Sequence, residues 1–167
     1  MACEIISCEG AVFVLWGKPT VDDVERVMNR LELIAEKSDR KIVYLTRVPV
    51  DAPAPDAVVR KALESVMPRA VELCSFYSII LEGDGFVSAV KRGILTGLLM
   101  LGWRRENFRV CASPKEVLPQ SVGSVREDVE RIHYLAGSKG LLTCGAPDGP
   151  NSGHARSYRP ADQHPWL

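Results

Sequence analysis

The chain has 167 residues, with 21 Lys and Arg against 21 Asp and Glu, 46% hydrophobic residues and five cysteines. A chain of this length buries about two-thirds of its unfolded surface, so its core needs no metal or disulfide. The balanced charge argues against a nucleic-acid partner, and the longest strongly apolar stretch, 94–103, is too short to span a membrane. Dispersed cysteines and an acidic N-terminus without a signal-peptide pattern predict a cytoplasmic protein with free thiols.

The N-terminal quarter predicts a hairpin followed by a helix. Two apolar runs, 5–8 and 11–16, flank the pair at 9–10, an acidic residue and a glycine that suit a two-residue turn. Apolar residues then recur at helical spacing over 21–35, with charged residues on the other face. Thr20 is the expected N-cap of this amphipathic helix.

The middle of the chain continues the alternation of strand and helix. The β-branched and aromatic run 41–45 predicts a strand, and three prolines within 48–55 predict a stiff loop. A second helix is expected from Asp56, with a kink or break near Pro68. The apolar run 76–81 is typical of a strand covered on both faces, and we expect it to be the central strand.

The C-terminal half predicts three further elements and a tail. A strongly apolar helix is expected over 86–101, and a final strand over 107–112. A short helix with proline at its first position follows at 113–118, and an amphipathic helix at 122–136. The remainder, 138–167, is rich in Gly, Pro, Ser and Asn without an apolar period, so we expect a flexible tail.

This order of elements predicts an α/β fold. Strands and helices that alternate at intervals of about 30 residues imply right-handed crossovers between parallel strands. We therefore expect a mostly parallel, mixed sheet of four or five strands with an N-terminal antiparallel hairpin, covered by helices. Residues 1–137 would form one domain that includes the helix 122–136.

Two loops are the places to look for function, because ligands bind beyond the carboxyl ends of parallel strands. The loop 46–56 is either a rigid recognition surface or a simple connection capped at Asp56. The loop 82–88 contains glycines that would let an anion approach the backbone, but its two carboxylates oppose an anion, and we favour a plain turn over a ligand site. The candidate partner-binding or anion-binding residues are Arg47, Asp51, Asp56, Gly83, Asp84, Gly85, Val87, Ser88, Lys91 and Arg92.

No catalytic residues, metal or cofactor are predicted. His133 stands on a helix without a nucleophile or carboxylate at a recognisable spacing. Cys144, His154 and His164 match no compact zinc pattern and lie in the expected tail. The helix 86–101 is apolar beyond what one sheet face requires, so homodimerisation is expected through Leu98, Leu99 and Trp103.

Four segments together resemble a STAS-type domain: 10–17 (GAVFVLWG), the strand 41–45, 78–86 (SIILEGDGF) and 107–117 (NFRVCASPKEV). The resemblance covers about residues 1–118 and is one of pattern. Anti-sigma-factor antagonists of this family carry a phosphorylated serine, whereas 47–56 here contains neither Ser nor Thr. Related STAS-like and lipid-carrying SEC14-like sequences lack that serine too.

The resemblance implies a non-catalytic regulatory module that docks a protein partner through the loop 47–56 and the segment 83–92. The alternative is a carrier or sensor of an apolar or phosphate-bearing small ligand, held between the helix 86–101 and the sheet. An enzyme is the third reading, with least support from the residues.

Overall fold

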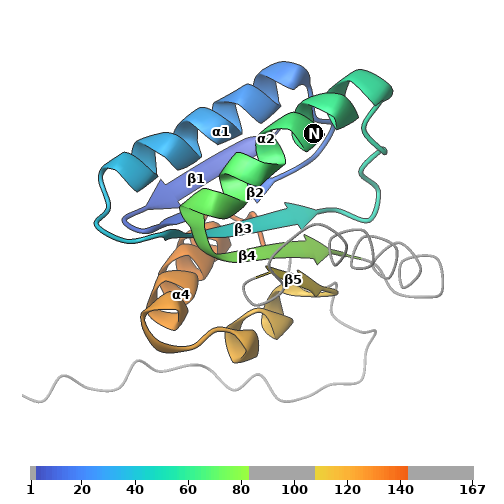
Figure 1. Cartoon of the computed structure of the whole chain (residues 1–167). Helices are drawn as coiled ribbons and strands as arrows, with labels where there is room; N and C mark the ends of the chain where they lie inside the picture. The colour runs from blue at the N-terminus through green and yellow to red at the C-terminus, as the bar shows by residue number, and fades with distance from the viewer. Residues whose placement is uncertain (1–2, 83–107, 143–167) are drawn as a thin grey trace, which may run out of the picture.

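The computed structural model describes residues 3–82 and 108–142. They contain one five-stranded sheet with the spatial order β1-β2-β3-β4-β5 (Figure 1). The strands are β1 (Glu4–Cys8), β2 (Ala11–Leu15), β3 (Ile42–Val48), β4 (Cys74–Leu81) and β5 (Phe108–Cys111). β1 pairs antiparallel with β2, and the other neighbours pair in parallel. The predicted fold class is therefore confirmed, including the opening hairpin.

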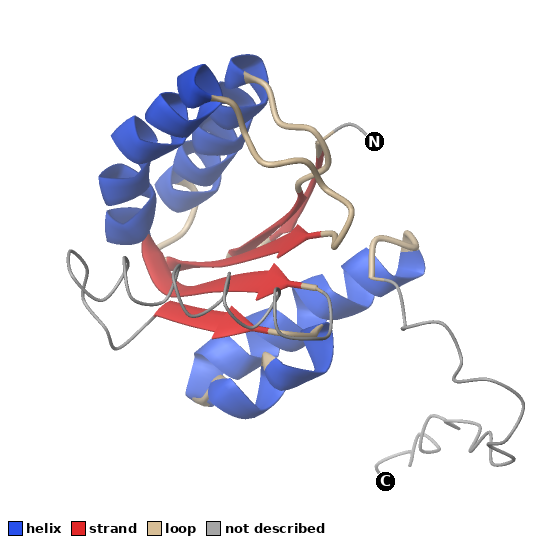
Figure 2. Ribbon diagram, turned by 90° about the vertical axis from the view of Figure 1, so that its right-hand side faces the viewer, coloured by secondary structure: helices blue, strands red, loops and turns tan. Residues whose placement is uncertain are grey.

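Helices cover both faces of the sheet (Figure 2). α1 (Val21–Glu36) and α2 (Ala57–Leu73) lie together on one face. The short helices η2 (Pro114–Glu116) and η3 (Leu118–Gln120) and the longer α4 (Gly123–Ser138) lie on the other. Because β2, β3 and β4 follow one another across the sheet, right-handed crossovers place both α1 and α2 on the same face.

The core is divided by the sheet into two layers. Side chains alternate along β2, so Val12 and Val14 join the cluster under α1 and α2, while Phe13 and Leu15 join the cluster against α4. All four of these side chains are at most 2% exposed. The alternation is regular along β2, whereas the pairing of β3 with β4 has an irregularity between Ile42 and Val43.

The starts of α1 and α2 follow the predicted capping chemistry. Thr20 and Asp23 form a capping box, in which each side chain accepts a hydrogen bond from the other residue's backbone N–H. The Asp56 carboxylate accepts hydrogen bonds from the N–H groups of Val58 and Val59, both at 2.9 Å. These caps satisfy helix donors that have no partner inside the helix.

Three predictions about the elements need correction. α2 continues through Pro68 without a break, because Glu64 and Pro68 lie on the solvent side, where water can satisfy the carbonyl that proline leaves free. The central strand is β3, since the hairpin adds two strands on one side of it. The compact unit also extends beyond residue 137: α4 ends at Ser138, and Leu141 is 6% exposed.

The predicted helix 86–101, with its proposed self-association residues Leu98, Leu99 and Trp103, lies outside the described residues, as does the tail from residue 143. None of the helices in the described ranges is both long and apolar enough to cross a bilayer.

Candidate functional site

An apolar cavity of about 310 Å³ lies between the helices α1 and α2 and the sheet. It is lined by side chains from both helices, from the strands under them and from the loops at their ends. These are Trp16, Gly17, Pro19, Val24, Val27, Met28, Leu31, Tyr44, Thr46, Val48, Pro53, Pro55, Leu63, Val66, Met67, Ala70, Tyr77, Ile79 and Leu81. None of these residues is charged.

The strand alternation of β3 and β4 forms the floor of the cavity. Parallel pairing places Tyr44 beside Tyr77, and Val48 beside Leu81. The latter two lie at the carboxyl ends of their strands, where parallel sheets bind ligands. The floor therefore extends from the middle of the sheet to the carboxyl ends of β3 and β4, where binding was expected.

Aromatic side chains form one end of this floor. The rings of Tyr44 and Tyr77 meet edge to face with centroids 4.7 Å apart, and Tyr77 stacks on Phe108 at 5.0 Å. Burial raises the pKa of both tyrosines, so their hydroxyls are neutral at physiological pH. The floor thus offers neutral hydroxyl groups and apolar surface, and no charge.

Thr46 adds an aliphatic hydroxyl to the lining of the cavity. It lies on β3 beside Ile79 of β4 and is 2% exposed. Its hydroxyl is near enough to the Tyr44 hydroxyl to lower the pKa of that phenol slightly, against the larger effect of burial. Even so, Thr46 Oγ1 forms no hydrogen bond of acceptable geometry with the residues that the structure describes. A buried hydroxyl without a partner costs about 1–3 kcal/mol, so the position needs an explanation.

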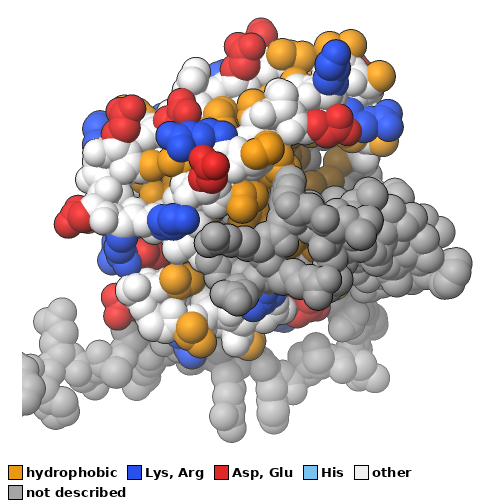
Figure 3. All heavy atoms as spheres, viewed as in Figure 1, with side chains coloured by type: hydrophobic (Ala, Val, Ile, Leu, Met, Phe, Trp, Pro, Cys, Tyr) orange, Lys and Arg blue, Asp and Glu red, His pale blue; other side chains and the backbone are white. Residues whose placement is uncertain are grey.

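The proline-rich loop between β3 and α2 closes one side of the cavity. Pro53 and Pro55 line it, while Asp51 and Ala54 of the same loop are exposed. Hydrophobic side chains reach the surface among the charged side chains of this side of the molecule (Figure 3). The loop predicted as a recognition surface therefore separates the cavity from solvent.

Arg47, a predicted binding residue, is largely buried and forms an ion pair within the protein. It is 5% exposed, and its Nε and Nη2 donate to the two carboxylate oxygens of Glu82, each at 2.7 Å. Its Nη1 donates to the carbonyl of Leu141. The alternation of β3 turns Arg47 toward the α4 face, where it joins the ends of two strands to the segment after α4.

The other predicted site residues divide into three groups. Asp56 caps α2, as the simpler reading of that loop proposed. Asp51 is exposed and free to meet a partner. The remaining candidates lie outside the described ranges; they are Gly83, Asp84, Gly85, Val87, Ser88, Lys91 and Arg92.

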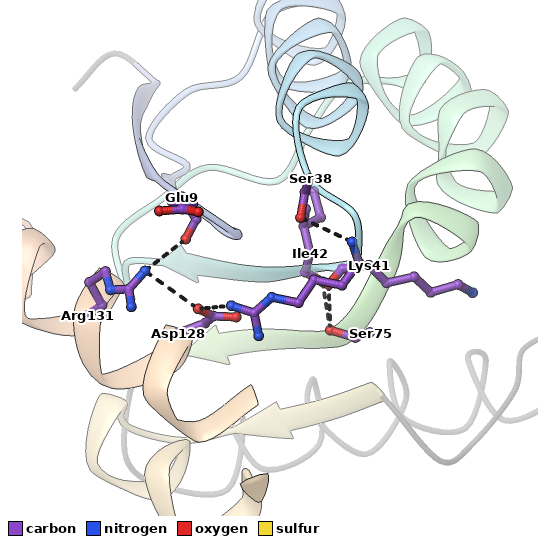
Figure 4. Close-up of polar contacts among 8 residues, drawn as sticks. Glu9, Ser38, Lys41, Ile42, Ser75, Asp128 and Arg131 are labelled. Atoms are coloured by element: carbon purple, nitrogen blue, oxygen red, sulfur yellow. Dashed lines mark hydrogen bonds and ion pairs between the residues drawn. The ribbon is translucent and has the colours of Figure 1, made fainter. Parts of the chain in front are cut away.

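A polar cluster lies at the other end of the strands, beside the β1-β2 turn and the start of β3 (Figure 4). Asp128 of α4 is 1% exposed, and its Oδ1 lies 2.9 Å from Arg40 Nη2 and 3.8 Å from Arg131 Nη1. Arg131 also donates to the Glu9 carbonyl at 3.4 Å. The carboxylate is already neutralised by these two cations, so we interpret the cluster as structural: it ties α4 to the β1-β2 turn and to the start of β3.

Burial disfavours the reactive thiolate form of the cysteines in the described ranges. Cys3, Cys8, Cys74 and Cys111 are free, as predicted. Burial raises the pKa of Cys3 and of Cys74 to about 12, which leaves almost no thiolate at neutral pH. No group of three or more metal-binding side chains occurs within residues 3–82 and 108–142; Cys144, His154 and His164 lie beyond them.

His133 is partly buried on α4 and provides a pH-dependent term in stability. Burial lowers its pKa below the ordinary value of 6.5, and a hydrogen bond to the Pro114 backbone acts weakly in the opposite direction. The unfolded chain therefore takes up this proton first as the pH falls. The contribution of neutral His133 to the free energy of unfolding is therefore complete above pH 6.5. It is lost as the pH falls toward the lower pKa of His133 in the folded state.

We expect His133→Gln to reduce the loss of unfolding free energy between pH 7 and pH 5, because glutamine keeps an N–H donor and does not titrate. Urea unfolding at several pH values measures this slope. Equal slopes in the two proteins would show that His133 titrates alike in the folded and unfolded states.

The sequence did not predict this cavity. Its floor residues are part of an ordinary pattern of alternating strands, and its walls are ordinary helix faces. The one local signal was Thr46, a polar residue on the same strand face as Tyr44 and Val48. A search of protein-family models, curated proteins and solved structures gives no match to this chain. The STAS resemblance remains a prediction from pattern.

Proposed function

We propose that the protein is a non-catalytic carrier or sensor of a small apolar molecule, which binds in the cavity between α1, α2 and the sheet. The supporting observation is the cavity itself. Protein interiors are close-packed and contain few voids larger than a water molecule. An apolar cavity of about 150 Å³ is enough to bind benzene, and this one is about twice that size at about 310 Å³.

The site differs from the one expected from sequence. The small-ligand alternative placed a ligand against the helix 86–101, with its polar group at Gly83–Gly85, whereas the cavity lies under α1 and α2. The lining residues in the described part of the chain include no Lys, Arg or His. This supports the apolar form of the ligand over the phosphate-bearing form, because a buried phosphate needs a cation or several N–H donors.

Docking of a protein partner through the loop 47–56 is compatible with this proposal. The loop supplies Pro53 and Pro55 to the cavity and presents Asp51 to solvent. A molecule that pushes on the prolines from inside would change the surface that a partner meets outside. In a STAS-like regulatory module, the loop would then report whether the cavity is occupied.

Filling the cavity tests the proposal. Ala70 lines the cavity and is 4% exposed, so Ala70→Leu places a larger apolar side chain in the binding space. We expect the neutral two-ring fluorescent probe 1-naphthylamine to bind the wild-type protein 1:1, and Ala70→Leu to weaken binding by about tenfold or more, the effect of about 1.4 kcal/mol of steric conflict.

Ala57→Leu is the matched control, because Ala57 is an exposed residue of the same helix. It should leave probe binding unchanged. Thermal unfolding of both variants checks the fold, and Ala70→Leu should unfold at an equal or higher temperature because it fills a void. A wild-type protein that binds no probe, or equal binding by Ala70→Leu, would overturn the proposal.

A further inference from the structure

The lining of the cavity contains one buried hydroxyl without a hydrogen-bond partner among the described residues, that of Thr46, and we infer that the ligand is an uncharged molecule with a hydrogen-bonding group that pairs with this hydroxyl. An alcohol, a phenol or a ketone with an apolar body has this chemistry. The inference rests on the proposed function, because it names the class of molecule that the same cavity would hold.

The environment of Thr46 supports the pairing. Its side chain lines the cavity, is 2% exposed and has no hydrogen-bond partner for Oγ1 in the described part of the chain. Valine has the same shape and no hydroxyl to leave unpaired. The unpaired Thr46 hydroxyl therefore lowers the stability of the ligand-free protein. A ligand that forms a hydrogen bond with Oγ1 removes this energetic cost.

The surroundings also exclude a charged group on the ligand. Among residues 3–82 and 108–142, the side chains that line the cavity include no Lys, Arg, His, Asp or Glu. Arg47, the next residue after Thr46, is on the other side of the strand and is bound to Glu82. A carboxylate beside Thr46 would therefore be buried without a counterion, which is far more costly than burying an alcohol.

The volume limits the size of the ligand. The cavity, at about 310 Å³, has about twice the volume of one that holds the six carbon atoms of benzene. By this proportion it accommodates about ten to twelve non-hydrogen atoms. A medium-length chain or a two-ring molecule is of this size, and a whole phospholipid is not.

Three two-ring compounds of similar size test the inference by displacement of 1-naphthylamine at pH 7. They are 2-naphthol, naphthalene and 2-naphthoate, which differ in carrying a hydroxyl, no polar group and a charge. In the wild-type protein, naphthoate should bind at least tenfold more weakly than naphthol. In Thr46→Val, the affinity for naphthol relative to that for naphthalene should fall by about two- to tenfold, the effect of one neutral hydrogen bond.

Thr20→Val is the control substitution, because the Thr20 hydroxyl is already used in the cap of α1. It should leave the ratio of the two affinities unchanged and lower the unfolding temperature. Thr46→Val should raise the unfolding temperature of the empty protein by about 2–4 °C, since it removes an unpaired buried hydroxyl.

The outcomes separate the inference from the proposed function. If wild type binds none of the compounds, both fail. If it binds naphthol and naphthalene but Thr46→Val leaves their ratio unchanged, the cavity binds apolar molecules without using Thr46, and only the inference fails. Equal affinity for naphthoate and naphthol, or a lower unfolding temperature for Thr46→Val, would also overturn the inference.

Discussion

Arg47→Met is expected to lower the free energy of unfolding by about 3–5 kcal/mol, the usual effect of breaking a buried ion pair. The Arg47 side chain is 6% exposed and that of Glu82 is 19% exposed. Without the guanidinium, the Glu82 carboxylate is left with no cation at its two hydrogen-bonded oxygens, and the Leu141 carbonyl loses a donor. Urea denaturation measures the change.

Two controls show whether the burial of the pair causes this loss. Arg69 contacts Glu72 and Glu32, but its side chain is 56% exposed, so Arg69→Met should change the stability little. The double variant Arg47→Met/Glu82→Leu should recover most of the lost stability, because an apolar pair can replace a buried ion pair at little cost. If Arg47→Met were as mild as Arg69→Met, the pair would not be a major link between the sheet and the C-terminal segment.

The sequence did not predict this link between Arg47 and Glu82. Arg47 was selected because it follows a strand and begins a proline-rich loop, which is where α/β proteins bind ligands. Sequence position cannot reveal that a carboxylate on the neighbouring strand faces the same side. Glu82 contacts Arg47 only because β3 and β4 pair in the register that places Val48 beside Leu81. For a related reason, the sequence did not predict that the start of the expected tail is fixed: the Leu141 carbonyl is bound by Arg47, 94 residues earlier.

Local sequence patterns predicted the structure better than they predicted long-range contacts. The pair at 9–10 predicted the hairpin turn, Thr20 and Asp56 predicted the helix caps, and the apolar runs predicted the strands. Each of these signals depends on neighbours within a few residues. The cavity depends instead on how closely α1 and α2 approach the sheet, which is set by side chains from six separate segments. For that reason the fold class could be predicted from the sequence, and the candidate site could not.

The β1-β2 turn was predicted from its local sequence, but its contacts with α4 depend on the fold. A substitution in this turn is expected to cause the second large loss of stability. Gly10 has a φ of +76°, a conformation that the acidic-glycine pair predicted. A side chain here would meet a second obstacle that only the fold reveals: a Cβ atom on Gly10 would lie 3.2 Å from Oδ2 of Asp128. Asp128 holds Arg40 and Arg131 and is itself 1% exposed, so it has little room to move.

Gly10→Ala should therefore destabilise the protein by about 2–4 kcal/mol. About 1–2 kcal/mol comes from the left-handed backbone, and the rest from displacing a buried, ion-paired carboxylate. Gly140→Ala separates the two contributions, because Gly140 has a φ of +69° but nothing within 4 Å of its Cβ position. Gly140→Ala should therefore lower the free energy of unfolding only by the backbone contribution.

A double-mutant cycle measures the steric contribution directly. In an Asp128→Ala background the obstacle is absent, so adding Gly10→Ala should cost no more than Gly140→Ala costs in the wild type. Asp128→Ala itself should be tolerated, since the side chains of Arg40 and Arg131 are 45% and 49% exposed and remain hydrated without their partner. If Gly10→Ala costs the same in both backgrounds, Asp128 does not restrict this turn, and the cluster does not fix α4 against the hairpin.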